Sequence, residues 1–144
     1  MKIKPFVKDY LTRLSQILDD IDADVVSDIV NTFEETIKNK SRIYILGNGG
    51  SAATASHIVN DLGAGLRRRG IINFDVTSLG DNSPVITAIA NDIGYENIFY
   101  MQMKGHINAN DVVVAISCSG DSPNIIKAAD YAKNLGCKII GVTG

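Results

Sequence analysis

Two short apolar segments, each followed by a polar loop and a helical pattern, constrain the fold of this 144-residue chain most strongly. Residues 42–47 run into the glycine-rich turn 47–51, and residues 112–116 run into the serine-rich loop 117–123. Strands that are apolar nearly throughout are typical of a parallel sheet covered on both faces. We therefore predict that both loops lie at the carboxyl ends of parallel strands, where such sheets bind ligands.

The rest of the chain alternates between helical and strand-like patterns. Helices are predicted over 5–21, 25–39, 51–64, a segment containing 85–89, 95–104 and 123–135, and strands over 42–47, 71–76, 112–117 and 138–143. This order predicts an α/β fold, a three-layer αβα sandwich with a parallel sheet, preceded by an N-terminal helical hairpin.

The hairpin, residues 1–40, is separated here from an α/β domain of residues 41–144. Its helices carry apolar stripes, for example Phe6, Tyr10 and Leu14, which need a cover from the domain's own sheet layer or from another subunit. Because a parallel α/β chain that stops on a strand lacks its closing helix, we expect a truncated C-terminus.

Composition excludes several classes of protein. The net charge of −2 gives no indication of nucleic-acid binding. The N-terminus lacks the uninterrupted apolar segment of a signal peptide, and no stretch approaches the ~18 apolar residues of a membrane span. Cys118 and Cys137 show no metal-type spacing, so we expect reduced thiols in a cytoplasmic protein.

The glycine-rich turn has the features of an anion site. Gly49 and Gly50 allow the backbone to approach a ligand, the helix behind them offers free N–H groups, and Asn48 and Ser51 add polar side chains. The turn matches neither the Walker pattern nor Gly-x-Gly-x-x-Gly, so no nucleotide cofactor is expected. Taken alone, it could equally be a tight turn.

The second loop strengthens the phosphate hypothesis. Ser117, Ser119 and Ser122 supply three hydroxyls before a helix N-terminus that Ser122 is predicted to cap. Asp121 would oppose an anion unless it points away, and the alternative is a capped helix with incidental serines. Together the two loops favour binding of a phosphate group.

Two other pairs of residues are candidates for chemistry. His57 and Asp61 lie four residues apart on the first-loop helix and therefore share a face. They could shuttle protons, form half of a metal site, or make a surface ion pair. Asn91 and Asp92 could face the ligand or end their helix.

Four segments in this order resemble the SIS (sugar isomerase) domain family, and within it the phosphoheptose isomerase group. They are Gly47-Asn48-Gly49-Gly50-Ser51-Ala52-Ala53, His57, Ala90-Asn91-Asp92-Ile93-Gly94-Tyr95-Glu96 and Ser117-Cys118-Ser119-Gly120-Asp121-Ser122-Pro123-Asn124. The resemblance implies a flavodoxin-like sandwich that assembles as a homotetramer with sites at subunit interfaces.

The resemblance also implies roles for individual residues. The phosphate would be held by the three serines, the sugar chain would contact Asn48 to Ser51, and Asn91 and Asp92 would line the pocket. Asp61 occupies the position of a catalytic glutamate, and His57 that of a histidine which binds zinc in some members. A glutamine and a second histidine of the family come from a C-terminal helix that this sequence lacks.

Three positions depart from the family pattern. Asp61 is one methylene shorter than glutamate, Gly65 stands where an arginine is frequent, and Cys118 replaces a threonine. These departures bear on catalysis more than on sugar-phosphate binding, because a general base must reach the proton that it removes.

The resemblance leads to one principal functional hypothesis and two alternatives. The first is isomerisation of sedoheptulose 7-phosphate to an aldose through an enediol, with Asp61 as base, for the heptose units of surface polysaccharide. The second is a non-catalytic SIS regulator or scaffold of the replication-initiator-associating type. A third, an amino-sugar-forming isomerase, would need an amidotransferase partner.

Overall fold

The computed structural model describes residues 2–144, which divide into two compact units, one ending at Asn31 and the other running from Thr32 to Gly144. The helices are α1 (Ile3–Asp19), α2 (Ala23–Asn39), α3 (Gly50–Val59), α4 (Leu66–Arg68), α5 (Ser83–Ile93), α6 (Tyr100–Met103) and α7 (Pro123–Asn134). The strands are β1 (Ile43–Gly47), β2 (Val76–Ser78), β3 (Val112–Ser117) and β4 (Lys138–Thr143). A π-helical turn, η1 (Asn60–Gly65), follows α3, and a 3₁₀ turn, η2 (Tyr95–Asn97), precedes α6.

The two predicted N-terminal helices are present. Asp22 precedes α2, and its side chain accepts hydrogen bonds from the backbone N–H groups of Asp24 and Val25 in the first turn of this helix, at 2.8 and 3.4 Å. No residue of α1 is buried, and its apolar stripe is exposed from Phe6 to Leu18. No helix among residues 2–144 is both long enough and apolar enough to cross a membrane.

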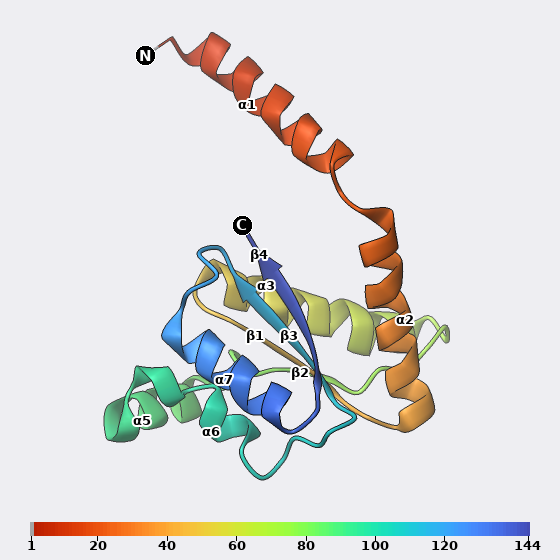
Figure 1. The fold of residues 1–144 in the computed structure, drawn as a ribbon, viewed down its shortest axis with the longest axis vertical. Helices are drawn as coiled ribbons and strands as arrows, with labels where there is room; N and C mark the ends of the chain where they lie inside the picture. Colours follow the sequence, from red (N-terminus) through yellow and green to blue (C-terminus); the bar gives the residue numbers. More distant parts are fainter. Residues whose placement is uncertain (1) are drawn as a thin grey trace. The chain divides into compact units, whose positions relative to one another are not determined.

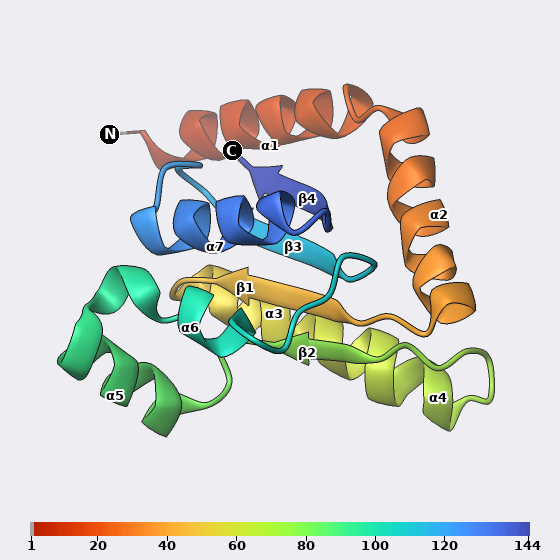
Figure 2. The same ribbon diagram turned by 60° about the horizontal axis from the view of Figure 1, so that its bottom comes forward.

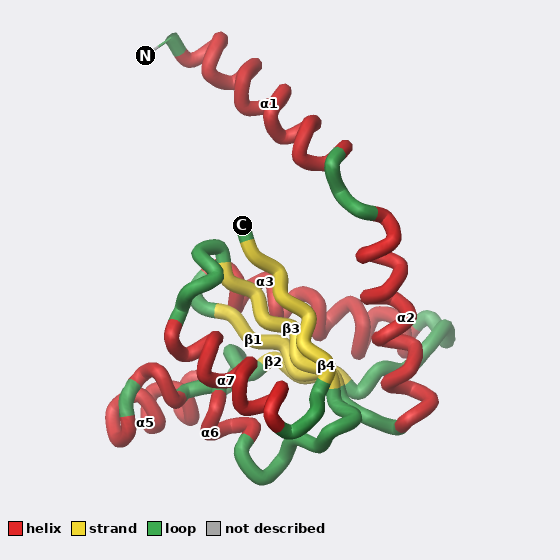
Figure 3. The backbone as a smooth tube through the Cα atoms, viewed as in Figure 1, coloured by secondary structure: helices red, strands yellow, loops and turns green. Residues whose placement is uncertain are grey.

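The predicted parallel sheet is confirmed. Its strands lie in the order β2-β1-β3-β4, and every neighbouring pair is parallel (Figures 1 and 3). The chain leaves β1 toward β2 on one side and leaves β3 toward β4 on the other. The strand order therefore reverses between β1 and β3, and the loops that follow these two strands lie at the same end of the sheet.

Alternate residues of β1 face two separate hydrophobic layers, as expected for a strand with a side-chain period of two. Tyr44 and Leu46 pack in the layer that includes residues of α6 and α7. Ile43 and Ile45 pack in the opposite layer, with α3 and the last part of α2. Figure 2 shows α7 and α3 on opposite faces of the sheet, which gives the three predicted layers.

The second strand was predicted too early in the sequence. It was expected over residues 71–76, but β2 contains Val76–Ser78. Pairing with β1 decides its position, because Ile43 donates its backbone N–H to Asp75 and then aligns with Val76. Ile71, which made the earlier segment look strand-like, is exposed.

Two predicted helices are not continuous. The helix expected over residues 51–64 is α-helical only to Val59, and the next six residues form the π-helical turn η1. Such turns widen the helix locally and change the direction of the side chains that follow. The helix expected over 95–104 is divided into η2 and α6.

Gly47 ends β1 where α3 approaches the strand most closely. A Cβ atom built on Gly47 would lie 2.7 Å from the Cβ of Ser51 and 2.8 Å from its carbonyl carbon. Both atoms belong to the rigid first turn of α3, so no flexible side chain can move aside. The glycine is therefore required for packing of the strand against the helix.

We predict that Gly47→Ala lowers the free energy of unfolding by about 1–3 kcal/mol, the usual cost of overpacking. Urea denaturation followed by circular dichroism measures it. Gly50→Ala is the matched control, because its new Cβ would meet no atom within 4 Å. Equal stability of the two variants would contradict the packing argument.

Candidate functional site

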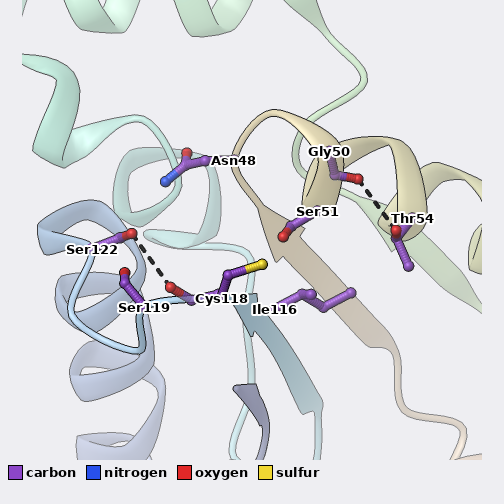
Figure 4. Close-up of a pocket in the computed structure, with 9 residues that line it drawn as sticks. Asn48, Gly50, Ser51, Thr54, Ile116, Cys118, Ser119 and Ser122 are labelled. Atoms are coloured by element: carbon purple, nitrogen blue, oxygen red, sulfur yellow. Dashed lines mark hydrogen bonds between the residues drawn. The ribbon is translucent and has the colours of Figure 1, made fainter. Parts of the chain in front are cut away.

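A cavity of about 660 Å³ lies between the two loops that follow β1 and β3. Its lining residues come from the ends of these strands, the two loops and the first turns of α3; they are Asn48, Gly50, Ser51, Thr54, Ile116, Ser117, Cys118, Ser119 and Ser122 (Figure 4). The predicted meeting of the two loops is therefore confirmed.

The glycine loop turns the chain directly from β1 into α3. Gly49 has a φ of 52°, a left-handed conformation that favours glycine. The backbone carbonyl of Asn48 accepts a hydrogen bond from the backbone N–H of Ser51 at 2.9 Å, which closes the turn. The positive end of the α3 dipole lies at this turn, and Gly50 and Ser51 of the first turn line the cavity.

The serine loop brings hydroxyl groups to the other side of the cavity. Ser117 and Ser122 lie with their Oγ atoms 3.4 Å apart, and the Ser117 hydroxyl accepts the backbone N–H of Gly120 at 3.2 Å. Gly120 has a φ of 72°, so the loop depends on a glycine at this turn.

The predicted capping role of Ser122 is wrong. Ser122 is at the N-cap position of α7, but its side chain makes no capping hydrogen bond. The Asn124 side chain accepts the backbone N–H of Ile125 at 3.0 Å in its place. The Ser122 hydroxyl is therefore available to a ligand.

The two loops are joined by hydrogen bonds between side-chain amides. Asn48 Nδ2 donates to Asn124 Oδ1 at 2.9 Å, and Asn124 Nδ2 donates to Asn48 Oδ1 at 2.8 Å. Tyr95 adds a bond from its hydroxyl to Asn48 Oδ1 at 3.0 Å. These hydrogen bonds link the glycine loop directly to the serine loop.

The chemistry of the cavity suits an anion held by neutral donors. Hydroxyls, one amide and the N-termini of α3 and α7 surround it, and its lining contains no carboxylate. Asp121 is exposed and is not among the lining residues, so the predicted opposition to an anion does not arise within the cavity.

His57 and Asp61 form the predicted pair on one helix face, with His57 Nε2 3.2 Å from Asp61 Oδ2. Both side chains are exposed, and neither lines the cavity. Thr54, which precedes His57 by three residues, does line it. On this helix face, Thr54 therefore lies at the cavity, and His57 and Asp61 lie outside it.

Asn91 and Asp92 also lie outside the cavity lining. They are in the last turn of α5, where Asn91 Nδ2 donates to Asp92 Oδ1 at 2.8 Å. The structure thus brings the glycine and serine loops together and leaves the other two predicted pairs outside the cavity lining.

The metal hypothesis needs more ligands than the described residues provide. Residues 2–144 contain no cluster of three or more His, Cys, Asp or Glu side chains that could hold a metal ion. A zinc site usually takes three or four protein ligands. His57 and Asp61 supply two donors, which do not complete such a site.

Sequence reasoning missed three lining residues. Thr54 follows Ser51 by three residues on the same helix, and this spacing was a usable signal. Ile116 is the last apolar residue of β3 before the serine loop. Cys118 lies between two serines that were predicted to bind phosphate, and this position indicated the cavity.

We predict that a thiol reagent modifies Cys118 well before Cys137. Cys118 is exposed in the cavity, whereas burial and then the nearby Asp111 carboxylate raise the pKa of the Cys137 thiol and reduce its reactive thiolate. Timed alkylation with iodoacetamide and peptide mass analysis measures both rates.

Inorganic phosphate should slow modification of Cys118 alone, because an anion between the loops would cover it. Faster modification of Cys137, or equal protection of both cysteines, would contradict this assignment of the cavity.

Comparison with known proteins agrees with the geometry. The chain is 41% identical over 112 residues to a phosphoheptose isomerase of Aliarcobacter butzleri, across 76% of this chain and 58% of the relative. It is also 41% identical over 117 residues to a phosphoheptose isomerase of Helicobacter pylori, across 80% of this chain and 59% of the relative. The chain thus spans less than two thirds of the length of these relatives.

Solved structures extend the comparison to the whole described fold. The phosphoheptose isomerase of Neisseria gonorrhoeae superposes with a TM-score of 0.86 at 27% identity, covering 99% of this chain and 76% of that one. The SIS domain profile matches residues 6–144. The parallel sheet, the two loops and all helices except the first three residues of α1 lie within this matched region, and this chain belongs to the SIS domain family.

Proposed function

We propose that the protein is an aldose–ketose isomerase of a phosphorylated sugar, sedoheptulose 7-phosphate. The observation that carries the proposal is the cavity between the loops after β1 and β3, with its serine hydroxyls and two helix N-termini. The similarity to proteins named phosphoheptose isomerase supports the choice of substrate. The product would supply heptose units of surface polysaccharide.

Phosphate binding is assigned to the serine loop. Ser117, Ser119 and Ser122 would donate to phosphate oxygens, and the N-terminus of α7 would add its partial positive charge. No lysine or arginine lines the cavity. Neutral donors therefore carry the binding, as they do at other helix N-termini that bind phosphate.

The sugar chain would extend from the phosphate across the glycine loop and along α3. Ser51 and Thr54 line this path, and His57 and Asp61 follow on the same face. Asp61 is seven residues after Thr54, which corresponds to about 10 Å along a helix. An extended seven-carbon chain anchored at the serine loop suits this separation.

The proposed reaction moves two protons and no other atoms. Asp61 removes a proton from C1 of the ketose while the C2 carbonyl oxygen gains a proton, which gives an enediol. A proton is then delivered to C2 while the C1 hydroxyl loses its own, and the aldose forms. His57, 3.2 Å from Asp61, would hold the carboxylate in position and exchange protons with it.

The proposal assigns no step to a metal ion, because the two donors His57 and Asp61 do not make a zinc site.

The exposed apolar stripe of α1 supports a homo-oligomer, a homotetramer in our proposal, in which a second copy covers Phe6, Tyr10 and Leu14. Two free thiols support a cytoplasmic location, which is reducing.

One observation favours a second candidate, a non-catalytic sugar-phosphate-binding regulator. His57 and Asp61 are exposed and outside the cavity lining, whereas the three serines proposed to bind phosphate all line the cavity. Such a protein would bind the same ligand without turning it over. Binding and turnover must therefore be measured separately.

We predict that sedoheptulose 7-phosphate raises the Tm of the protein and that Ser119→Ala removes most of this shift. Loss of one hydrogen bond to a charged oxygen weakens binding by about tenfold, or ~1.5 kcal/mol. Differential scanning fluorimetry measures the shift. Ser27→Ala is the control, because Ser27 is exposed on α2 and outside the cavity; an unchanged shift in Ser119→Ala would contradict the phosphate site.

We predict that Asp61→Asn lowers kcat by about 10²–10⁴-fold, the usual contribution of general acid–base catalysis, and leaves the ligand-induced Tm shift intact. Aldose formation from sedoheptulose 7-phosphate measures kcat. Binding without turnover in the unaltered protein would establish the regulator, and neither binding nor turnover would remove both candidates.

A further inference from the structure

We infer that Asn124 and Tyr95 are positioning residues that make Asn48 face the cavity as a hydrogen-bond donor only. The oxygen it meets on the ligand is then an acceptor, either on the phosphate or on the carbonyl that becomes the enediol. This inference rests on the proposed function and adds the residues that orient one of its contacts.

One backbone group beside this pair of amides has a certain polarity. The N–H of Ile125 can only donate, and it lies 3.0 Å from a side-chain amide atom of Asn124. That atom must therefore be the oxygen, Oδ1. An amide oxygen and nitrogen are similar in size, so a partner of this kind is what determines the orientation of an asparagine.

The orientation of Asn124 then determines that of Asn48. With Oδ1 on Ile125, the other amide atom of Asn124 is Nδ2, and it can only donate. It lies 2.8 Å from an amide atom of Asn48, which must be Oδ1. Asn48 Nδ2 consequently donates back to Asn124 Oδ1 at 2.9 Å.

Tyr95 completes the set of partners. Its hydroxyl donates to Asn48 Oδ1 at 3.0 Å, so this oxygen accepts two hydrogen bonds and has no lone pair left for a ligand. Nδ2 carries two hydrogens, of which one is bonded to Asn124. Asn48 lines the cavity, and its remaining N–H is the group it can offer there.

The arrangement resists reversal because of where Asn124 lies. Its side chain is 2% exposed, so water cannot replace a lost partner. Turning one amide over would place like groups of Asn48 and Asn124 against each other, and turning both over would place Asn124 Nδ2 against the Ile125 N–H, which also donates to the Ser122 carbonyl at 3.0 Å. Facing donors in a buried position are costly. The start of α7 thus determines the polarity of a residue on the other loop.

The chemical consequence concerns which ligand oxygen fits. A sugar hydroxyl that must donate finds no acceptor at Asn48. A phosphate oxygen, or a carbonyl oxygen that gains negative charge as the enediol forms, accepts the free N–H. In the second case the bond strengthens during the reaction, as at an oxyanion hole.

Two variants and a matched control test the inference on the full chain. Tyr95→Phe deletes the exposed hydroxyl and leaves the amide pair. Asn124→Leu removes the pair without adding charge. Tyr131→Phe is the control, because the Tyr131 hydroxyl has no hydrogen-bond partner among residues 2–144 and lies outside the cavity.

Binding of inorganic phosphate by calorimetry and turnover of sedoheptulose 7-phosphate are measured for each protein, with Tm as a check of folding. We expect a loss of about threefold to tenfold in Tyr95→Phe, the equivalent of one weakened hydrogen bond, and a larger loss in Asn124→Leu. The loss falls on phosphate affinity if Asn48 meets the phosphate, and on kcat if it meets the carbonyl. A purely structural role would lower Tm and change neither.

The side-chain amide spectrum of ¹⁵N-labelled protein gives an independent readout. Phosphate or sugar phosphate should shift one of the two Asn48 Nδ2 protons, identified by its absence in Asn48→Ala, and the shift should shrink in Tyr95→Phe. Unaltered protein that responds to ligand, together with both variants behaving like Tyr131→Phe, would overturn this inference alone. Unaltered protein that neither binds nor turns over either compound would overturn the proposed function as well.

Discussion

Pairing of β1 with β3 is the interaction on which the site depends. The two strands align in parallel from Ile43 with Val112 to Gly47 with Ile116, so both end at the same level. Each is buried on both faces, with Ile45 and Val113 fully inaccessible. Burial of such side chains stabilises the fold by about 1.5–3 kcal/mol each, which makes a shifted register unfavourable. Strand pairing in the core consequently places both loops at the same end of the sheet.

Close approach and hydrogen bonding then shape what the strands bring together. Gly47 allows α3 to start directly against the sheet, and Gly49 turns the chain into it. Asn48 and Asn124 join the two loops from opposite sides. The buried Asn124 side chain accepts the Ile125 N–H in the first turn of α7, and the Ser122 hydroxyl makes no capping bond there. The Asn124 amide therefore bonds to the first turn of α7 and to Asn48 of the glycine loop, which lines the candidate ligand site.

The parts of the fold that could be predicted are those governed by local pattern. Apolar runs marked β1, β3 and β4, and Pro123 marked the start of α7. The short edge strand was misplaced because only contact with β1 distinguishes Val76–Ser78 from the apolar residues before it. The π-helical turn after Val59 was equally hidden, since its hydrogen bonds are set by how the widened helix packs rather than by residue type.

For the site, sequence alone determined the donor chemistry: two polar loops behind parallel strands, rich in serine and glycine and without a lysine. The motif segments also indicated the family, because their order and spacing can be read directly from the sequence. Tertiary structure decided which of these groups meet. It brought Ser51 and Thr54 opposite Ser119 and Cys118, left His57 and Asp61 on an exposed face, and made Tyr95 and Asn124 partners of Asn48. The physical reason is that hydrogen bonds between distant segments depend on distance and direction, which no single segment specifies.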